Sequence, residues 1–280
     1  MKRFLFFLAA AVSMAACTND TLAPLDDART VVFNLSADGL SSPTFTRATG
    51  ITSSDMTDLW IFDFVNEECV QYLHITPEDE AWGSPSMTLA IGTHNICFLA
   101  SRGEDPTLDE DAQTVTWSAP RDAFWCDKDV EITQGTSSVS AVLNRVATKL
   151  RIVVNDQVPA GAKTITATPA KWYYGINYWT GEPASQQQRD RSVTIPDTYI
   201  GTSGQLAVSF FGISGTREWT TDVMLTATDA DGNPFTNISI AAAPFKANRA
   251  TEYSGRLFSE TPSWTLSLND AWEASYTGEW

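Results

Sequence analysis

The sequence predicts an all-β protein with two β-sandwich domains in tandem. Short runs of alternating or continuous apolar residues recur at spacings of about ten residues, while helical periodicity is nearly absent. Turn-forming sequences such as Asp38-Gly39 and residues 229–233 separate these runs. A chain of 280 residues with only 19% charged residues is long enough for two such domains, each with its own core.

Strand-like segments can be placed in order along both halves of the chain. In the first half they are residues 30–35, 59–64, 72–75, 87–91, 95–100, 114–117, 130–133, 138–146 and 149–154. In the second half they are residues 164–168, 192–195, 205–211, 223–228, 235–241, 251–258 and 264–268. Polar residues around Pro159 and Gly161 interrupt the pattern and predict a hinge. We therefore divide the chain near residue 158.

The amino terminus has the features of an export signal. Lys2 and Arg3 precede an apolar run at residues 4–12, and small residues then lead to Cys17. This pattern predicts a lipoprotein signal peptide at residues 1–16, with Cys17 as the acylated first residue of the mature chain. The alternative is an ordinary signal peptide followed by a coincidental cysteine.

Charge and residue usage argue against several classes of function. The 34 acidic and 18 basic residues give a net charge of −16, which opposes nucleic-acid binding through phosphate neutralisation. Because the sequence has no nucleotide-binding glycine motif, nucleophile elbow or C-x-x-C pair, we expect no enzyme activity, no catalytic residues, no metal site and no cofactor. The acidic clusters at residues 78–80, 109–111 and 229–232 are interpreted as solvated loops, and calcium binding stays open.

The cysteines beyond Cys17 are Cys69, Cys97 and Cys126, so at most one disulfide can form within the mature chain. Cys97 lies in an apolar strand pattern, which favours a small core residue. A bridge between Cys97 and Cys126 is the alternative.

An aromatic cluster at residues 172–179 allows two interpretations. Exposed Tyr and Trp rings on a sheet can stack on sugar rings, which makes Trp172, Tyr174 and Trp179 candidate glycan contacts. Large aromatic residues are also ordinary core residues of a β-sandwich, and we favour that interpretation. A surface-exposed glycan-binding lipoprotein is accordingly the alternative function.

Several segments together resemble the fimbrillin family, the type V pilus subunits of Gram-negative surface fimbriae. Residues 57–63 (TDLWIFD) resemble an early strand of the family's amino-terminal domain, and residues 143–151 (LNRVATKLR) resemble the segment that closes it. Residues 245–251 (FKANRAT) and 268–272 (LNDAW) resemble segments near the family's carboxyl end. The resemblance implies two transthyretin-like β-sandwich domains, export to the outer membrane as a lipoprotein, and a place in cell-surface fimbriae.

The resemblance also implies an assembly mechanism. In that family a trypsin-like protease cuts after an arginine that follows the first strand, and the matching bond here joins Arg47 to Ala48. A strand of a neighbouring subunit then replaces the lost strand by β-strand addition. The strand removed would carry the apolar residues Val31, Phe33 and Leu35. The candidate donor strand carries Trp264, Leu266 and Leu268.

These expectations divide the chain into four segments: a signal peptide (1–16), a lipidated pro-segment with the first strand (17–47), an amino-terminal domain (48–158) and a carboxyl-terminal domain (159–280). The expected function is that of a stalk or tip subunit in cell adhesion. Its expected partners are other fimbrial subunits, the outer membrane through the lipid before processing, and a receptor on a host or bacterial surface. Stalk, tip and anchor positions stay open, as does the identity of the receptor.

Overall fold

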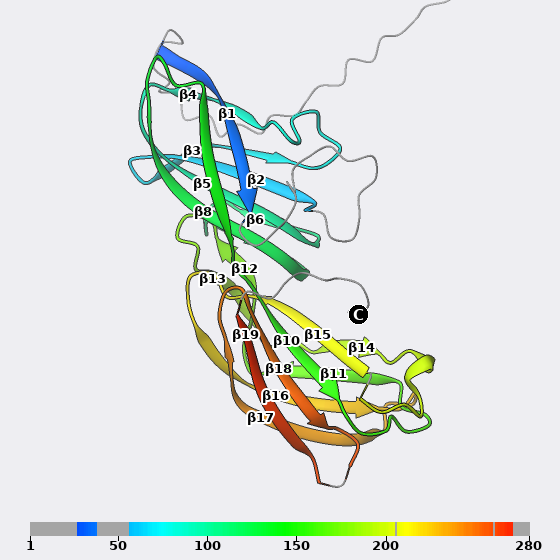
Figure 1. Ribbon diagram of the computed structural model, residues 1–280. Helices are drawn as coiled ribbons and strands as arrows, with labels where there is room; N and C mark the ends of the chain where they lie inside the picture. The colour runs from blue at the N-terminus through cyan, green and yellow to red at the C-terminus, as the bar shows by residue number, and fades with distance from the viewer. Residues whose placement is uncertain (1–26, 38–55, 205, 260, 271–280) are drawn as a thin grey trace, which may run out of the picture.

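The computed structural model describes residues 27–37, 56–204, 206–259 and 261–270, and this part of the chain is almost entirely β-strand (Figure 1). The strands of the first half are β1 (Ala28–Ala37), β2 (Asp58–Val65), β3 (Glu68–Ile75), β4 (Ser86–Ala90), β5 (Gly92–Glu104), β6 (Thr107–Asp109), β7 (Thr114–Thr116), β8 (Ala119–Ile132), β9 (Ser138–Arg145) and β10 (Ala147–Val154). Those of the second half are β11 (Thr164–Pro169), β12 (Trp172–Asn177), β13 (Pro183–Gln187), β14 (Arg191–Thr194), β15 (Leu206–Ile213), β16 (Trp219–Thr228), β17 (Pro234–Phe245), β18 (Arg249–Arg256) and β19 (Ser263–Asp270). A short 3-10 helix, Asp197–Tyr199, follows β14. The predicted all-β class is confirmed.

The first β-sandwich is a single sheet that folds over on itself. Its strand order is β3-β2-β5-β8-β9-β1-β4, and the ladder between β8 and β9 is limited to two paired residues on each strand. The strands on either side of this narrow contact pack face to face around one hydrophobic core. Strand β9 shows the period of two that such packing requires, since every second side chain is buried. The core includes Val31, Phe33, Leu89, Val139 and Leu143 from one layer, and Leu59, Ile61, Ile96, Phe98 and Phe124 from the other.

The second β-sandwich consists of two four-stranded sheets, β15-β10-β18-β19 and β14-β11-β16-β17. Strand β10 lies centrally in its sheet, where it pairs antiparallel with β15 and parallel with β18. Buried side chains of both sheets form a second core, which includes Leu150, Ile152, Ile165, Leu225 and Phe245. The tandem β-sandwich architecture expected from the sequence is therefore present.

A small third sheet joins the two sandwiches (Figure 1). Its order is β13-β12-β7-β6, so it combines two strands of the first half with two strands of the second. Gly175 on β12 lies so close to β7 that a Cβ atom there would approach the Val115 carbonyl oxygen to 2.7 Å. A third core between this sheet and the first sandwich includes Phe62, Leu99, Trp117 and Tyr178. The junction is therefore packed like the interior of a domain rather than like a flexible linker.

The boundary between the sandwiches differs from the one that we predicted at residue 158. Strand β10 belongs to the second sandwich over its whole length, so the change occurs at Val146, directly after β9. The expected hinge is part of the second sandwich, because the Asp156 carboxylate accepts the backbone N–H groups of Leu257 and Phe258 at 2.9 and 2.8 Å. Val158 is buried in the second core. The polar residues here fix a turn to the end of β18 instead of separating domains.

A buried ion pair lies at the observed boundary, and its arginine also bonds to a second segment that carries the fimbrillin resemblance. The Arg145 Nε atom donates to Asp122 Oδ1 at 2.9 Å, and Nη1 donates to Asn248 Oδ1 at 3.0 Å. The guanidinium also lies 4.9 Å from the centre of the Phe124 ring. Removing one partner of such a buried pair leaves the other charge uncompensated. Arg145 therefore ties the end of the first sandwich to the turn that precedes β18.

Candidate strand-exchange site

Strand β1, which the sequence analysis assigned as the exchangeable strand, lies inside a hydrogen-bonded sheet between two neighbours (Figure 1). Its first half, from Ala28 to Val32, pairs antiparallel with β4. Its second half, from Val32 to Ala37, pairs parallel with β9. Loss of β1 would therefore leave unpaired backbone groups on both neighbours.

The inner face of β1 completes the core of the first sandwich. Val31 is fully buried and Phe33 is 2% exposed, and the Phe33 ring packs edge-on against Phe98 with centroids 5.3 Å apart. Leu35 is half-buried at the margin of the same core. The side chains of Thr30 and Asn34, on the opposite face, are exposed, as the alternation of a half-buried strand requires. The structure thus gives β1 the amphipathic face that an exchangeable strand needs.

Strand β19, the candidate donor, forms an edge of the second sandwich. It pairs along its whole length with β18, and it ends the order of its sheet. Trp264 packs partly against the core, whereas Leu266 and Leu268 are 45% and 46% exposed. These three residues alternate along one face of the strand, yet two of them stay substantially in contact with solvent. β19 is consequently an edge strand whose apolar repeat is only partly buried.

The residues proposed for processing cannot be placed. Cys17, Arg47 and Ala48 all lie outside the described residues, so acylation and cleavage stay predictions. In the described part of the chain, no helix has the length and apolar character that crossing a bilayer requires.

Two of the three candidate glycan contacts, Trp172 and Tyr174 on β12, are wrong. Trp172 and Tyr174 are 1% and 0% exposed, and Trp172 Nε1 donates to the Phe211 carbonyl at 2.8 Å. Rings enclosed in this way cannot stack on a sugar. Trp179 is half-buried and packs on Phe64, with ring centroids 4.2 Å apart. These aromatic residues serve as core and junction residues, which is the interpretation that we favoured.

The cysteines form no disulfide among the described residues. Cys126 lies opposite Phe98 in the β5–β8 ladder, so Cys97 and Cys126 point to opposite faces of the sheet. Cys97 accordingly belongs to the junction core and Cys126 to the core of the first sandwich. Burial raises the pKa of the Cys126 thiol to about 12, and it raises the pKa of Cys97 as well. The two cysteines are therefore buried core residues whose thiols cannot form a disulfide with each other.

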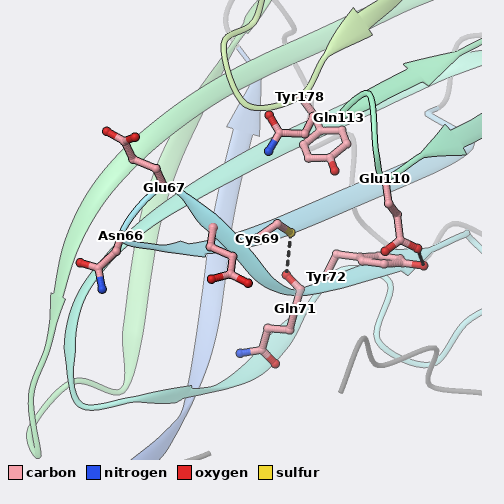
Figure 2. Close-up of a pocket in the computed structure, with 9 residues that line it drawn as sticks. Asn66, Glu67, Cys69, Gln71, Tyr72, Glu110, Gln113 and Tyr178 are labelled. Carbon is pink, nitrogen blue, oxygen red and sulfur yellow. Dashed lines mark hydrogen bonds between the residues drawn. The ribbon is translucent and has the colours of Figure 1, made fainter. Parts of the chain in front are cut away.

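A pocket that the sequence analysis missed opens beside the β2–β3 hairpin (Figure 2). Its volume is about 350 Å³. Tyr72 lies on one side, where its hydroxyl is 3.4 Å from Glu110 Oε1, and Glu68 and Gln113 supply further polar groups. The complete lining is Asn66, Glu67, Glu68, Cys69, Gln71, Tyr72, Glu110, Gln113 and Tyr178. Carboxylates, amides and a tyrosine in one pocket suit a neutral polyol better than an anion.

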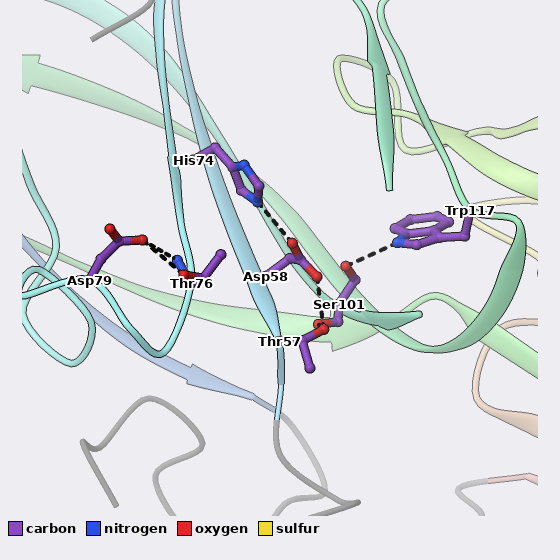
Figure 3. A network of polar contacts seen from close by, with 7 residues as sticks. All are labelled: Thr57, Asp58, His74, Thr76, Asp79, Ser101 and Trp117. Carbon is purple, nitrogen blue, oxygen red and sulfur yellow. Dashed lines mark hydrogen bonds and ion pairs between the residues drawn. The ribbon is translucent and has the colours of Figure 1, made fainter. Parts of the chain in front are cut away.

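Two histidine–aspartate pairs were also missed, because a lone histidine in a strand pattern gives no sign of its partner. One pair is partly exposed, with His74 Nε2 and Asp58 Oδ1 2.8 Å apart, and belongs to the polar network in Figure 3. The other pair, His94 and Asp63, is buried beneath β4. Within the described residues, neither pair belongs to a group of three or more side chains that could hold a metal ion.

The fold defines the protein as a tandem β-sandwich, and comparison with known proteins shows which proteins it is similar to. The chain belongs to a family of unknown function (DUF6562), which matches residues 107–280. A candidate cell adhesion protein of Bacteroides ovatus ATCC 8483 is similar in structure, with a TM-score of 0.52, 12% identity, and coverage of 86% of this chain and 97% of that one. A candidate cell adhesion protein of Bacteroides uniformis ATCC 8492 gives a TM-score of 0.51 at 11% identity, with coverage of 88% and 100%.

A fimbrial assembly protein of Parabacteroides distasonis ATCC 8503 is similar at a lower level, with a TM-score of 0.47, 11% identity, and coverage of 86% of this chain and 99% of that one. A comparison with curated proteins gave no match. At identities near these values, structural similarity establishes the fold. The fimbrillin-like fold that the sequence resemblance implied is therefore confirmed.

Proposed function

We propose that this protein is a structural subunit, of the stalk or the tip, of cell-surface fimbriae. In this proposal it is exported as a lipoprotein to the outer membrane, has no enzyme activity, and polymerises with other fimbrial subunits to mediate cell adhesion. The single observation that supports the proposal most is the position of β1, which is paired on both sides and fills the core, yet comes first among the described strands.

The place of β1 in the sequence matters because a single cut can remove it. Arg47 follows β1 and precedes β2, so cleavage there would separate residues 17–47 from the rest of the chain without cutting any other described strand. The same cut would separate the body from the lipid on Cys17. Exposure of the sites of Val31 and Phe33 would cost about 1.5–3 kcal/mol for each side chain. An open groove of this kind has a strong tendency to take up another strand.

Strand β19 of a neighbouring subunit is the candidate occupant. It already has the alternation of Trp264, Leu266 and Leu268, and it contributes little to its own core. Transfer into the β1 site would bury Leu266 and Leu268, which are half-exposed in the monomer. A strand in the place of β1 must run parallel to β9 and antiparallel to β4. The proposal therefore specifies the direction of the incoming strand.

The test is limited digestion of the recombinant full-length chain with a trypsin-like protease. We expect one early cut between Arg47 and Ala48, a resistant body that begins at Ala48, and oligomers that form only after the cut. Mass spectrometry of the native protein isolated from cells should likewise find an amino terminus at Ala48. A retained lipid on Cys17 would instead indicate an unprocessed precursor or an anchor subunit. Early cuts inside the sandwiches, or an intact bond after Arg47, would contradict the proposal.

Glycan binding is kept as a second candidate function, because the pocket in Figure 2 has suitable chemistry. It no longer rests on Trp172 and Tyr174, whose rings are buried. Binding in the pocket is compatible with a fimbrial role, since the pocket lies beside the β2–β3 hairpin and β1 contributes no residue to its lining.

A further inference from the structure

Strand β4 depends on β1 for all of its main-chain pairing. Among the described strands, β1 is the only partner of β4, which stands at the end of the strand order. If β1 is exchanged, β4 loses its only ladder at the moment when it must still form one wall of the acceptor groove. Something other than a backbone ladder has to hold β4 in place.

The direction of the β4 carbonyls shows where that support can act. Phe33 N–H donates to the Pro85 carbonyl at 2.8 Å, and Ile91 N–H donates to the Asp27 carbonyl at 2.7 Å. The backbone N–H and C=O groups of the odd-numbered β4 residues therefore point toward β1. Successive carbonyls along a strand point to opposite edges. The carbonyls of Thr88 and Ala90 therefore point away from β1, toward the edge that none of the described strands covers.

Side chains from the opposite layer bind both of those carbonyls. His94 Nε2 on β5 donates to the Ala90 carbonyl at 2.9 Å. Gln71 Nε2 on β3 donates to the Thr88 carbonyl at 2.9 Å. Asp63 on β2 holds the two donors in register, since its Oδ1 lies 2.6 Å from His94 Nδ1 and its Oδ2 accepts from Gln71 Nε2 at 2.9 Å.

Burial makes this arrangement rigid. Asp63 is 0% exposed and His94 is 3% exposed, so neither group can turn toward water without disturbing the core. Both ring nitrogens of His94 contact acceptors, and only an imidazolium has two N–H donors. The hydrogen bond and charge of Asp63 raise the pKa of His94 against the effect of burial. The cation and the carboxylate therefore neutralise each other beneath β4.

We infer that His94, Asp63 and Gln71 form a side-chain clamp that holds β4 on the body of the first sandwich when β1 leaves. The inference takes its biological meaning from the proposed strand exchange. The clamp residues are positioning residues: they act on the incoming strand through β4. With the clamp closed, the groove keeps both walls, and a new strand can pair with β4 and β9. With the clamp open, β4 detaches together with β1.

Thiol labelling of the full-length chain can separate the opening of β1 from that of β4. Phe33→Cys places a reporter on β1, and Met87→Cys places a reporter on the buried face of β4. Each variant is incubated with N-ethylmaleimide under native conditions, and labelling at that position is followed by peptide-resolved mass spectrometry. Rates are divided by those of the denatured chain at the same pH, which removes the intrinsic pH dependence of the thiol.

We expect the position 33 thiol to react at least about tenfold faster than the position 87 thiol, because β1 can open while β4 stays in place. In the His94→Gln background the two rates should become equal. His74→Gln is the matched control: it removes the other histidine–aspartate pair, which lies in the network of Figure 3 and whose histidine bonds to Asp58 rather than to β4. It should leave the difference unchanged. Equal rates in the parent, or an unchanged difference in His94→Gln, would overturn the inference.

Two further measurements do not depend on whether His94→Gln folds. Gln71→Ala removes one clamp bond from a half-exposed side chain, and it should accelerate labelling at position 87 only. The second is a pH profile of the parent. The charged groups that face His94 are Asp63 on β2 and Glu131 on β8, and β4 itself carries no titratable side chain.

Because the folded-state pKa of His94 is raised above its usual value, its contribution is complete at acidic pH and is lost as the pH rises through the folded pKa. The labelling ratio should therefore fall with rising pH in the parent and in His74→Gln, and stay flat in His94→Gln. A flat profile in the parent would overturn the clamp. These results do not require polymerisation, so failure of the clamp and failure of cleavage after Arg47 are distinguishable.

Discussion

Truncation of Phe33 provides the most direct measure of how strongly β1 is held. Its side chain is 2% exposed and packs edge-on against Phe98, so Phe33→Ala removes buried surface and leaves a cavity between ordered neighbours. Changes of this type cost about 3–5 kcal/mol, of which the aromatic pair accounts for about 0.5–1.5 kcal/mol. With a urea m-value of about 2 kcal/mol/M, the lower figure shifts the unfolding midpoint by about 1.5 M.

The assay is urea unfolding of the full-length chain, followed by peptide-resolved hydrogen exchange so that the two sandwiches are read separately. The loss should appear in the peptides of the first sandwich and leave β16 and β17 unchanged, because Phe33 contacts only the first core. Asn34→Ala is the matched control on the exposed face of the same strand, and it should change stability by about 0.5 kcal/mol or less. A loss below about 1 kcal/mol for Phe33→Ala, or one equal to that of the control, would refute the view that β1 completes this core.

Two other predictions concern the second sandwich and the pocket. Asp156→Ala should destabilise the second sandwich by about 2–3 kcal/mol, because two backbone N–H groups lose a charged acceptor; urea unfolding checks this, and Asp231→Ala in an exposed turn should be neutral. If the pocket of Figure 2 binds glycans, Tyr72→Ala should abolish the signal of the full-length chain on a glycan array, whereas Tyr199→Ala should retain it. Binding that survives Tyr72→Ala would exclude the pocket.

The local sequence pattern was sufficient to predict those strands in which apolar and polar residues alternate or apolar residues form a continuous run. The strand at β1 was expected at residues 30–35 and extends over Ala28–Ala37, and β9 shows the same close agreement. Strand β8 was only partly foreseen, because its first part, with Asp122 and Trp125 among its residues, has neither clear alternation nor a purely apolar run. This part of β8 faces the first core on one side and the junction core on the other. Side chains on both faces are therefore buried, and the sequence shows no alternation of apolar and polar residues.

The aromatic residues of β12 show a second limit of sequence reasoning. The same sequence around Tyr174 is compatible with an exposed sugar platform and with a packed junction. The choice depends on the second core, where Trp219 and Phe245, distant in the chain, pack edge-on against the Trp172 ring. The same limit applies to the clamp: Asp63, Gln71 and His94 lie on three different strands, and only the fold brings them to β4.

By itself, the sequence determined the all-β class, the two-sandwich plan and the amphipathic first strand, because these follow from the period of apolar residues and from turn chemistry between neighbours in the chain. Tertiary structure alone decided where one sandwich ends and the next begins, which aromatic rings meet solvent, and which side chains support β4. Those features depend on pairings between residues distant in the chain, and the free energy that selects such pairings comes from burial and hydrogen bonds that no local pattern records.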